Sequence, residues 1–263
     1  MKILFKYLGL ATIICLSFIL TEKTVTVMND MDEIMNTIKE QEKNYNIEPI
    51  DAKIENEYIK PGKYGKKVNI KKSYENMKKI GKFNDKYLIY DEIKPNISLE
   101  DNKDKIIIGN QNKTISLIFI IKKTDDIEQI KKILNKKNIK ASFFVDSEWL
   151  KKNKEICKEL IKENHTIGNI ENSSNMNYFW VNNTIQALGQ QKNYCYYENC
   201  KNTKDYKIKP TKTIKNSSEI KKHIEPGDII EIEKNKDLAI IIDYIKSRGI
   251  ELENIANHIE EKN

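Results

Sequence analysis

The hydrophobic residues of this chain follow one pattern in its N-terminal part and a different pattern after about residue 110. Over 28–43 apolar residues recur at helical spacing, which predicts a short amphipathic helix, and a second helix is predicted over 71–80. The residues between them, 47–69, are expected to be extended with a turn at Pro61. After Asn110 short apolar runs alternate with helical patterns, which is typical of parallel βα units.

This second part is predicted to fold as one α/β domain over 111–263, after a stalk and leader segment over 23–110 and an N-terminal segment over 1–22. Continuous apolar runs predict strands buried on both faces. The predicted strands are 115–121, 140–145 and 229–232, and the predicted helices are 125–137, 147–163 and 237–248.

The N-terminal segment has the charge pattern of an export signal. Lys2 and Lys6 precede an uncharged apolar stretch over 7–20, and charges return at Glu22. Positive residues before such a stretch keep the N-terminus in the cytoplasm and send the following domain outside. No small-x-small cleavage site follows, so an uncleaved single-pass anchor is favoured over a cleaved signal peptide and secretion, and over a buried core helix.

Composition then narrows the class of partner. The net charge is +7, but Arg248 is the only arginine. Lysine is a hydrated point charge, whereas arginine is preferred for phosphate and base-edge contacts, so no nucleic-acid binding is expected. A salt-sensitive attraction to anionic wall polymers or phospholipid headgroups remains compatible with the charge.

The cysteines give no metal signature. Cys15 lies in the apolar N-terminal stretch, which leaves Cys157, Cys195 and Cys200 for the folded part. A bond between Cys195 and Cys200 fits an oxidising compartment, and two unpaired thiols fit equally well. The spacing matches no Cys/His metal site.

The run KILNKKNIKASFFVDSEWLKKNKEICKELIKENHTIGN over 132–169 resembles the NodB homology domain of polysaccharide deacetylases, carbohydrate esterase family four. The resemblance rests on the order and spacing of Ala141, Phe143, Phe144, Trp149, His165, Ile167, Gly168 and Asn169. It extends more faintly over 58–252, where PGDIIEIE and AIIIDYIKSRGIEL look like the family's closing strand and helix. It implies a distorted, incomplete (β/α) barrel after the N-terminal anchor helix, with a groove at the C-terminal ends of the strands.

The family's chemistry, metal-assisted amide hydrolysis, is not expected here. One Asp and two His would hold the metal, a second Asp would act as base and a late His as acid. The positions that match these roles hold Ile121, Ile170 and Ser174 for the ligands, Ile120 for the base and Glu233 for the acid. Alkyl groups cannot donate electron pairs to a cation. We therefore expect no metal, no cofactor and no catalytic residue at these positions.

Other titratable residues are weaker candidates for a catalytic or metal-binding role. Asp125 and Asp126 echo the lost acidic pair, but acidic residues at the start of a predicted helix are explained by capping and the helix dipole. His165 matches the family's structural histidine, and His223 and His258 have no partner at ligand spacing, so none is expected to be catalytic.

Aromatic residues are the candidates for glycan contact. Trp180, Tyr194 and Tyr196 fit stacking on sugar rings in a vestigial groove, and they fit core or rim packing equally well. Glu233 fits a lone acid less well than a solvated carboxylate at a strand end.

The sequence therefore favours a pseudoenzyme of the cell envelope that binds glycan or a protein partner. One alternative is an active hydrolase of acetamide bonds that uses non-standard ligands such as Glu233 and Asp125. Another is a purely structural envelope protein. Metal content, acetate release and glycan retention distinguish the three.

Overall fold

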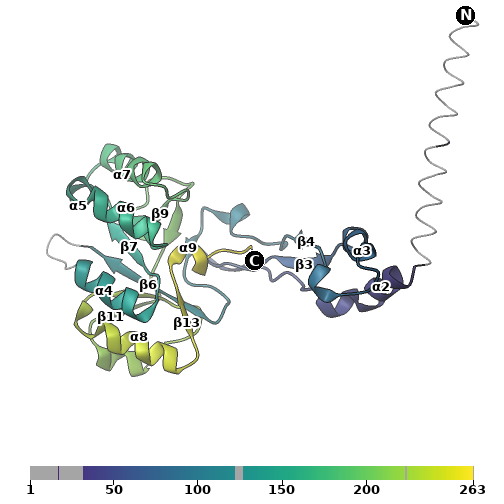
Figure 1. Ribbon diagram of the computed structural model, residues 1–263. Helices are drawn as coiled ribbons and strands as arrows, with labels where there is room; N and C mark the ends of the chain where they lie inside the picture. Colours follow the sequence, from purple (N-terminus) through teal and green to yellow (C-terminus); the bar gives the residue numbers. More distant parts are fainter. Residues whose placement is uncertain (1–16, 18–31, 122–126, 223, 263) are drawn as a thin grey trace, which may run out of the picture. The chain divides into compact units, whose positions relative to one another are not determined.

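The computed structural model describes residues 17, 32–121, 127–222 and 224–262 (Figure 1). The chain divides into two compact units: Met1–Pro49 with Gly65–Ile93, and Ile50–Tyr64 with Lys94–Asn263. In this division 50–64 and 94–110, which lie upstream of the predicted boundary, fall in the same unit as the residues after 110. The anchor predicted over 1–22 lies outside the described residues, within which no helix is long and apolar enough to cross a bilayer.

The first unit packs two helices against a two-stranded sheet. Its elements are α2 (Glu33–Tyr45), β3 (Gly65–Val68), α3 (Ile70–Lys78) and β4 (Tyr90–Ile93). The side chains of Asp32 and Asn69 cap the two helices by accepting backbone N–H groups. Met35, Ile38 and Met77 form its core with Val68, Tyr74 and Leu88. The described part of the helix predicted over 28–43, which is α2, thus packs in a small core.

The second unit is built on an 11-stranded sheet. Its path is β1-β2-β5-β10-β9-β8-β7-β6-β12-β11, and β13 also pairs with β6. The strands are β1 (Lys53–Glu55), β2 (Tyr58–Lys60), β5 (Ile106–Ile107), β6 (Thr114–Ile120), β7 (Ser142–Val145), β8 (Thr166–Asn169), β9 (Tyr194–Tyr196), β10 (Tyr206–Ile208), β11 (Lys212–Ile214), β12 (Ile229–Ile232) and β13 (Glu251–Glu253). From β2 to β11 neighbouring strands run parallel, so their C-terminal ends meet along one edge.

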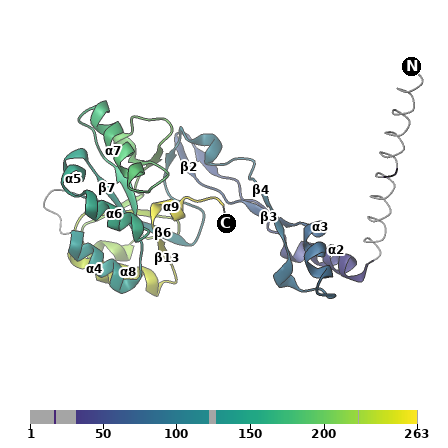
Figure 2. The same cartoon turned by 45° about the horizontal axis from the view of Figure 1, so that its top comes forward.

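The sheet curls into a half-barrel, which confirms the predicted fold class. The helices are α4 (Ile127–Lys137), α5 (Ser147–Lys152), α6 (Lys154–Lys162), α7 (Asn175–Ala187), α8 (Leu238–Ser247) and α9 (Ile255–His258). Short 3₁₀ helices cover Asp85–Tyr87, Glu100–Asn102, Tyr197–Asn199, Ser217–Lys222 and Asn235–Asp237. In both views α4 to α8 lie around the outside of the curled sheet (Figure 2).

The central strands β6, β7 and β8 are buried on both faces, since their successive side chains point to opposite sides of the sheet and nearly all are buried. In β6, Leu117 and Phe119 join the core under the outer helices, whereas Ile118 faces the inner core with Phe144 and Ile255. This explains why the sequence shows continuous apolar runs here. Strands were found close to the predicted 115–121, 140–145 and 229–232, but the helix predicted over 147–163 breaks at Asn153.

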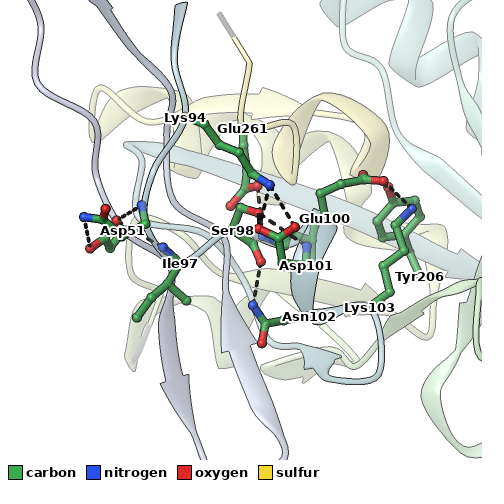
Figure 3. Close-up of polar contacts among 12 residues, drawn as sticks. Asp51, Lys94, Ile97, Ser98, Glu100, Asp101, Asn102, Lys103, Tyr206 and Glu261 are labelled. Atoms are coloured by element: carbon green, nitrogen blue, oxygen red, sulfur yellow. Dashed lines mark hydrogen bonds and ion pairs between the residues drawn. The ribbon is translucent and has the colours of Figure 1, made fainter.

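The C-terminal segment fastens the first strands of this unit to the barrel. The buried carboxylate of Glu261 accepts the backbone N–H groups of Gly62 and Leu99, both at 2.9 Å. Nearby, Asp101 accepts from Ser98 and pairs with Lys94 (Figure 3). The two contacts of Glu261 join residues that lie 199 and 162 positions apart in sequence.

Candidate functional site

A groove of about 860 Å³ lies where β6, β7 and β8 end. Because these strands are parallel neighbours, the residues after each one meet at the same edge. The lining residues are Ile120, Ile121, Asp146, Ser147, Glu148, Lys151, Ile170, Glu171, Asn172, Ser173, Asn177, Tyr196 and Asn199. The fold therefore brings Ile120 and Ile121, at the end of β6, together with Ile170, which follows β8.

Three isoleucines stand at the centre of this groove lining. The backbone N–H of Ile121 donates to Phe144, and that of Ile170 donates to Val145, so both extend the parallel ladder by one residue. The side chain of Ile121 is buried, and those of Ile120 and Ile170 are half-buried. We call Ile120, Ile121 and Ile170 the groove isoleucines.

The residues present do not fit a divalent metal. Such sites need about three donor groups from His, Asp, Glu or Cys, and the groove isoleucines offer hydrocarbon. The side chain of Ser174 accepts the N–H of Asn177 and caps α7 instead. Within the described part of the chain no three His, Cys, Asp or Glu side chains gather closely enough to hold a cation.

Glu233 also lies away from the groove lining. It follows β12, and its exposed carboxylate lies 3.6 Å from the ammonium of Lys215. Such an exposed ion pair contributes little free energy. A solvated carboxylate at a strand end, the simpler of the two interpretations, describes this residue.

Glu171 is the buried acid of the groove, and it is occupied by backbone groups. Its two oxygens accept the N–H groups of Ser147 at 2.9 Å and Ser173 at 2.7 Å. Burial acts to raise the pKa of Glu171, but hydrogen bonds from Ser147 and Ser173 outweigh it and lower the pKa to about 2. Glu171 therefore stays ionised at neutral pH and shapes the loops around the groove, which makes it a poor proton donor.

A buried polar network supports the groove from below. The side-chain amide of Asn169 donates to Asn182 at 2.7 Å and to the carbonyl of Tyr178 at 3.0 Å. Asp205 then accepts from both Asn182 and the Tyr178 hydroxyl at 2.6 Å. All four residues are buried. This network anchors the turn after β8 to α7 and to the start of β10.

A disulfide closes the loop that forms one wall of the groove. Cys195 and Cys200 are bonded, with their Cα atoms 5.4 Å apart, which settles the alternative that the sequence left open. Inside the loop, Tyr196 donates its hydroxyl to Glu231 at 3.2 Å, and Asn199 donates to the carbonyl of Ile170. The loop is thus tied to the turn that carries one groove isoleucine.

Of the three aromatic candidates for glycan contact, one lines the groove and two lie elsewhere. Tyr196 lines the groove. Tyr194 is only 2% exposed and stacks on Tyr206 with ring centroids 5.6 Å apart, so of the two alternatives left open for this residue the structure has core packing and not contact with sugar. Trp180 packs against the outer core under the ammonium groups of Lys151 and Lys154, and it does not line the groove.

The described histidines have structural environments. His165 is buried and accepts the backbone N–H of Ala141 at 3.1 Å, as expected for a structural residue. His258 is buried beside Asn110 and Thr114. Burial lowers the pKa of His165 and of His258 to about 4. The alternative residues Asp125, Asp126 and His223 lie outside the described residues.

Comparison with known proteins shows what part of this chain is similar to. Residues 108–203 match the family model described as polysaccharide deacetylase. These residues therefore resemble a polysaccharide deacetylase domain. This confirms the resemblance found in the sequence, and it places the groove isoleucines inside the matched residues.

Solved structures share the fold of this deacetylase-like chain. A CE4 family pseudoenzyme from Bacillus anthracis aligns with a TM-score of 0.62 at 24% identity, over 89% of this chain and 97% of that chain. A mutant of that protein with restored enzymatic activity aligns with a TM-score of 0.62 at 24% identity, over 88% of this chain and all of the other. The uncharacterized protein YlxY of Bacillus subtilis is 35% identical over 150 residues, 56% of this chain. The chain thus spans about half, 47%, of that relative's length.

Sequence reasoning missed the groups that hold the deacetylase-like groove in shape. Asn182 and Asp205 are 23 residues apart, and nothing in their local sequence indicates that they meet. Glu231 lies in the short apolar strand β12, and the alternation of side chains along this strand was not used to predict on which face of the sheet Glu231 lies. Asn169 entered only as one of the residues that carry the resemblance and Glu171 not at all, although their spacing of two is compatible with the observed hydrogen bond between them.

Proposed function

We propose that this chain is a catalytically inactive, deacetylase-like protein that binds glycan in its groove at the cell envelope. The observation that carries the proposal is the presence of the groove isoleucines where the family resemblance places two metal ligands and the base. Without electron-pair donors there, the groove has no means to polarise an acetamide oxygen or to activate water. The description of the Bacillus anthracis neighbour as a pseudoenzyme supports this proposal.

Glycan is the favoured ligand because the groove combines apolar and polar lining. Isoleucine side chains and the Tyr196 ring offer apolar surface, while Asn172, Asn177 and Asn199 offer amides around them. Sugar rings present both kinds of surface, and binding sites commonly pair an apolar lining with a few placed polar groups.

Binding and catalysis are tested together on the purified full chain. We expect measurable binding to N-acetylglucosamine oligomers by calorimetry, no acetate release, and no stoichiometric metal by elemental analysis. Tyr196→Ala should weaken binding about fivefold through loss of ring contact. Tyr197→Ala is the matched control, because that neighbouring ring does not line the groove. Stoichiometric zinc, cobalt or nickel together with acetate release would overturn the proposal.

The second candidate, an active hydrolase with non-standard ligands, finds less support. Glu233 faces Lys215 outside the groove lining, so it is poorly placed to act on a bound sugar. A purely structural role is the third candidate. It predicts that neither oligomers nor purified peptidoglycan retain the protein in a pull-down.

The envelope location is part of the proposal and rests on the sequence. Lysines before the apolar stretch over 7–20 favour an N-terminus in the cytoplasm and a domain outside. The disulfide between Cys195 and Cys200 fits the same oxidising side of the membrane. Protease added to intact cells should digest the domain, while its survival until the cells are lysed would contradict this orientation.

A further inference from the structure

The net charge of the chain is concentrated in one short segment of the first unit. Residues 66–86 contain eight lysines against Glu75 and Asp85, a net charge of +6. The whole chain has a net charge of +7, so all the other residues together carry only +1. Lysine is common throughout the chain, but elsewhere acidic residues balance it. The excess is therefore a local feature and not only a compositional bias.

The structure gathers part of this charge on one face of α3. Lys71, Lys72, Lys78 and Lys79 recur at intervals that bring them to the same side of a helix. All four are exposed, whereas Ser73, Tyr74 and Met77 on the opposite side are buried. Glu75 is the acidic residue within this stripe. The helix therefore packs by one side and presents a cationic side to solvent.

The connection from α3 to β4 continues the cationic side. It contains the exposed residues Lys82 and Lys86. We call Lys71, Lys72, Lys78, Lys79, Lys82 and Lys86 the lysine patch. Lys72 lies 3.8 Å from Asp91, an exposed pair that neutralises little of the patch charge.

Two apolar side chains are exposed within the same connection. Ile80 is 39% exposed and Tyr87 is 43% exposed, although Phe83 between them packs against the core of the unit. Gly81 lies between Ile80 and Lys82 with a positive φ of 76°, and its surroundings are open. This turn keeps Ile80 out of the core at a position flanked by lysines.

We propose that the lysine patch, with Ile80 and Tyr87, docks on the surface of an anionic phospholipid bilayer. Lysines near such a surface are attracted to its negative potential. Aliphatic and aromatic side chains among them enter the interfacial region, where tyrosine is favoured. This site is separate from the groove and does not depend on the function proposed for it.

A bilayer fits the patch better than a soluble anionic polymer does. A polyphosphate chain requires cations alone and leaves Ile80 and Tyr87 unused. The chain also has no arginine in this unit, which disfavours bidentate recognition of single phosphate groups. Dispersed ammonium groups match a surface whose charge is spread over many headgroups.

The test uses the full chain with vesicles and reports locally on the patch. Trypsin cleavage after Lys82 is followed with vesicles of phosphatidylcholine alone or with added phosphatidylglycerol. We expect the anionic vesicles to slow this cleavage about tenfold, and high salt to remove the effect. Cleavage after Lys204, in an exposed turn of the second unit, should not change. Because the readout is local, membrane attachment elsewhere in the chain does not mimic it.

Matched triple variants assign the effect to the patch. K71Q/K79Q/K86Q leaves the scissile Lys82 in place and should reduce the protection to about threefold or less. K132Q/K136Q/K162Q removes the same charge from exposed positions of the second unit and should retain full protection. Equal loss of protection in both variants, or equal protection by neutral and anionic vesicles, would overturn the proposal.

The apolar contribution separates a bilayer from a polymer. I80S/Y87S should weaken the protection given by anionic vesicles while leaving the charge intact. If this variant keeps the wild-type protection and soluble polyphosphate protects Lys82 as well as vesicles do, the patch binds anionic polymer and the bilayer proposal fails.

Discussion

Residues 165–169 and residues 170–174 are consecutive in the chain, but the fold places different demands on them. The first half forms β8 and its approach, and His165, Gly168 and Asn169 are all buried with close neighbours. A Cβ on Gly168 would lie 2.4 Å from the Phe144 ring, so only glycine fits there. The second half lines the groove or caps α7. Its first residue, Ile170, is only half-buried.

This difference explains how a fold can be retained while the side chains along its groove change. A change in the first half leaves buried groups without partners or creates a clash, and the whole domain loses stability. Apart from the buried Glu171 and the capping residue Ser174, a change in the second half alters the groove surface, where alternative side chains are tolerated as long as the loops stay in place. Residues 165–169 are therefore constrained by their packing in the barrel, whereas most of residues 170–174 are constrained less.

The largest expected effect is a loss of stability at acidic pH. The pKa of buried His165 and His258 falls from the ordinary 6.5 to about 4 on folding, so both are neutral in the native state. Their stabilising contribution is complete above pH 6.5 and is lost as the pH falls from 6.5 to about 4, together roughly 6 kcal/mol. Glu171 in the second half should not titrate in this range, because its native pKa is about 2.

Urea denaturation at several pH values measures this loss. The H165Q/H258Q variant is the control, since its free energy of unfolding should depend much less on pH between 6.5 and 4. An unchanged slope in that variant would show that other groups cause the acid sensitivity.

The next effect compares one asparagine from each half. Asn169→Ala should lower the free energy of unfolding by about 3 kcal/mol, because it removes buried hydrogen bonds to Tyr178 and Asn182. Asn172→Ala, at an exposed position, should change it by less than about 0.5 kcal/mol. Similar values from urea denaturation for the two variants would refute the division between the halves.

A smaller effect is expected at the opposite wall of the groove. Opening the bond between Cys195 and Cys200 releases a six-residue loop and should lower the free energy of unfolding by about 2 kcal/mol. Hydrogen exchange should increase around Ile170, whose carbonyl holds Asn199. The C195S/C200S variant should match the reduced wild type and no longer respond to reductant. A response to reductant in that variant would point to another site.

The smallest effect tests the assignment of Ser174. If this residue only caps α7, Ser174→Ala costs about 1 kcal/mol in the free energy of unfolding. It should leave the affinity for glycan oligomers measured by calorimetry unchanged. Asn175→Ala, one position later at an exposed site, serves as the control. A change in metal content in Ser174→Ala would contradict the capping role.

Local sequence was sufficient to predict much of the barrel. The apolar runs in β6, β7 and β12 are buried on both faces, so their periodicity and length alone indicated parallel strands. The resemblance over 132–169 then indicated the fold and located the positions of Ile121 and Ile170. The ends of these strands could be predicted because each one follows from the apolar run of that strand alone.

The domain boundary and the support of the groove were decided only by tertiary structure. Glu261 holds Gly62 and Leu99, and Asp205 holds Tyr178 and Asn182, through contacts between residues far apart in the chain. Such a hydrogen bond forms only where the fold brings a carboxylate and a donor together. Many exposed acidic residues of this lysine-rich and acid-rich chain have similar neighbours in the sequence, so the local sequence does not show which acids form these bonds. The sequence by itself determined which side chains are available, whereas the curling of the sheet decided which of them are buried together.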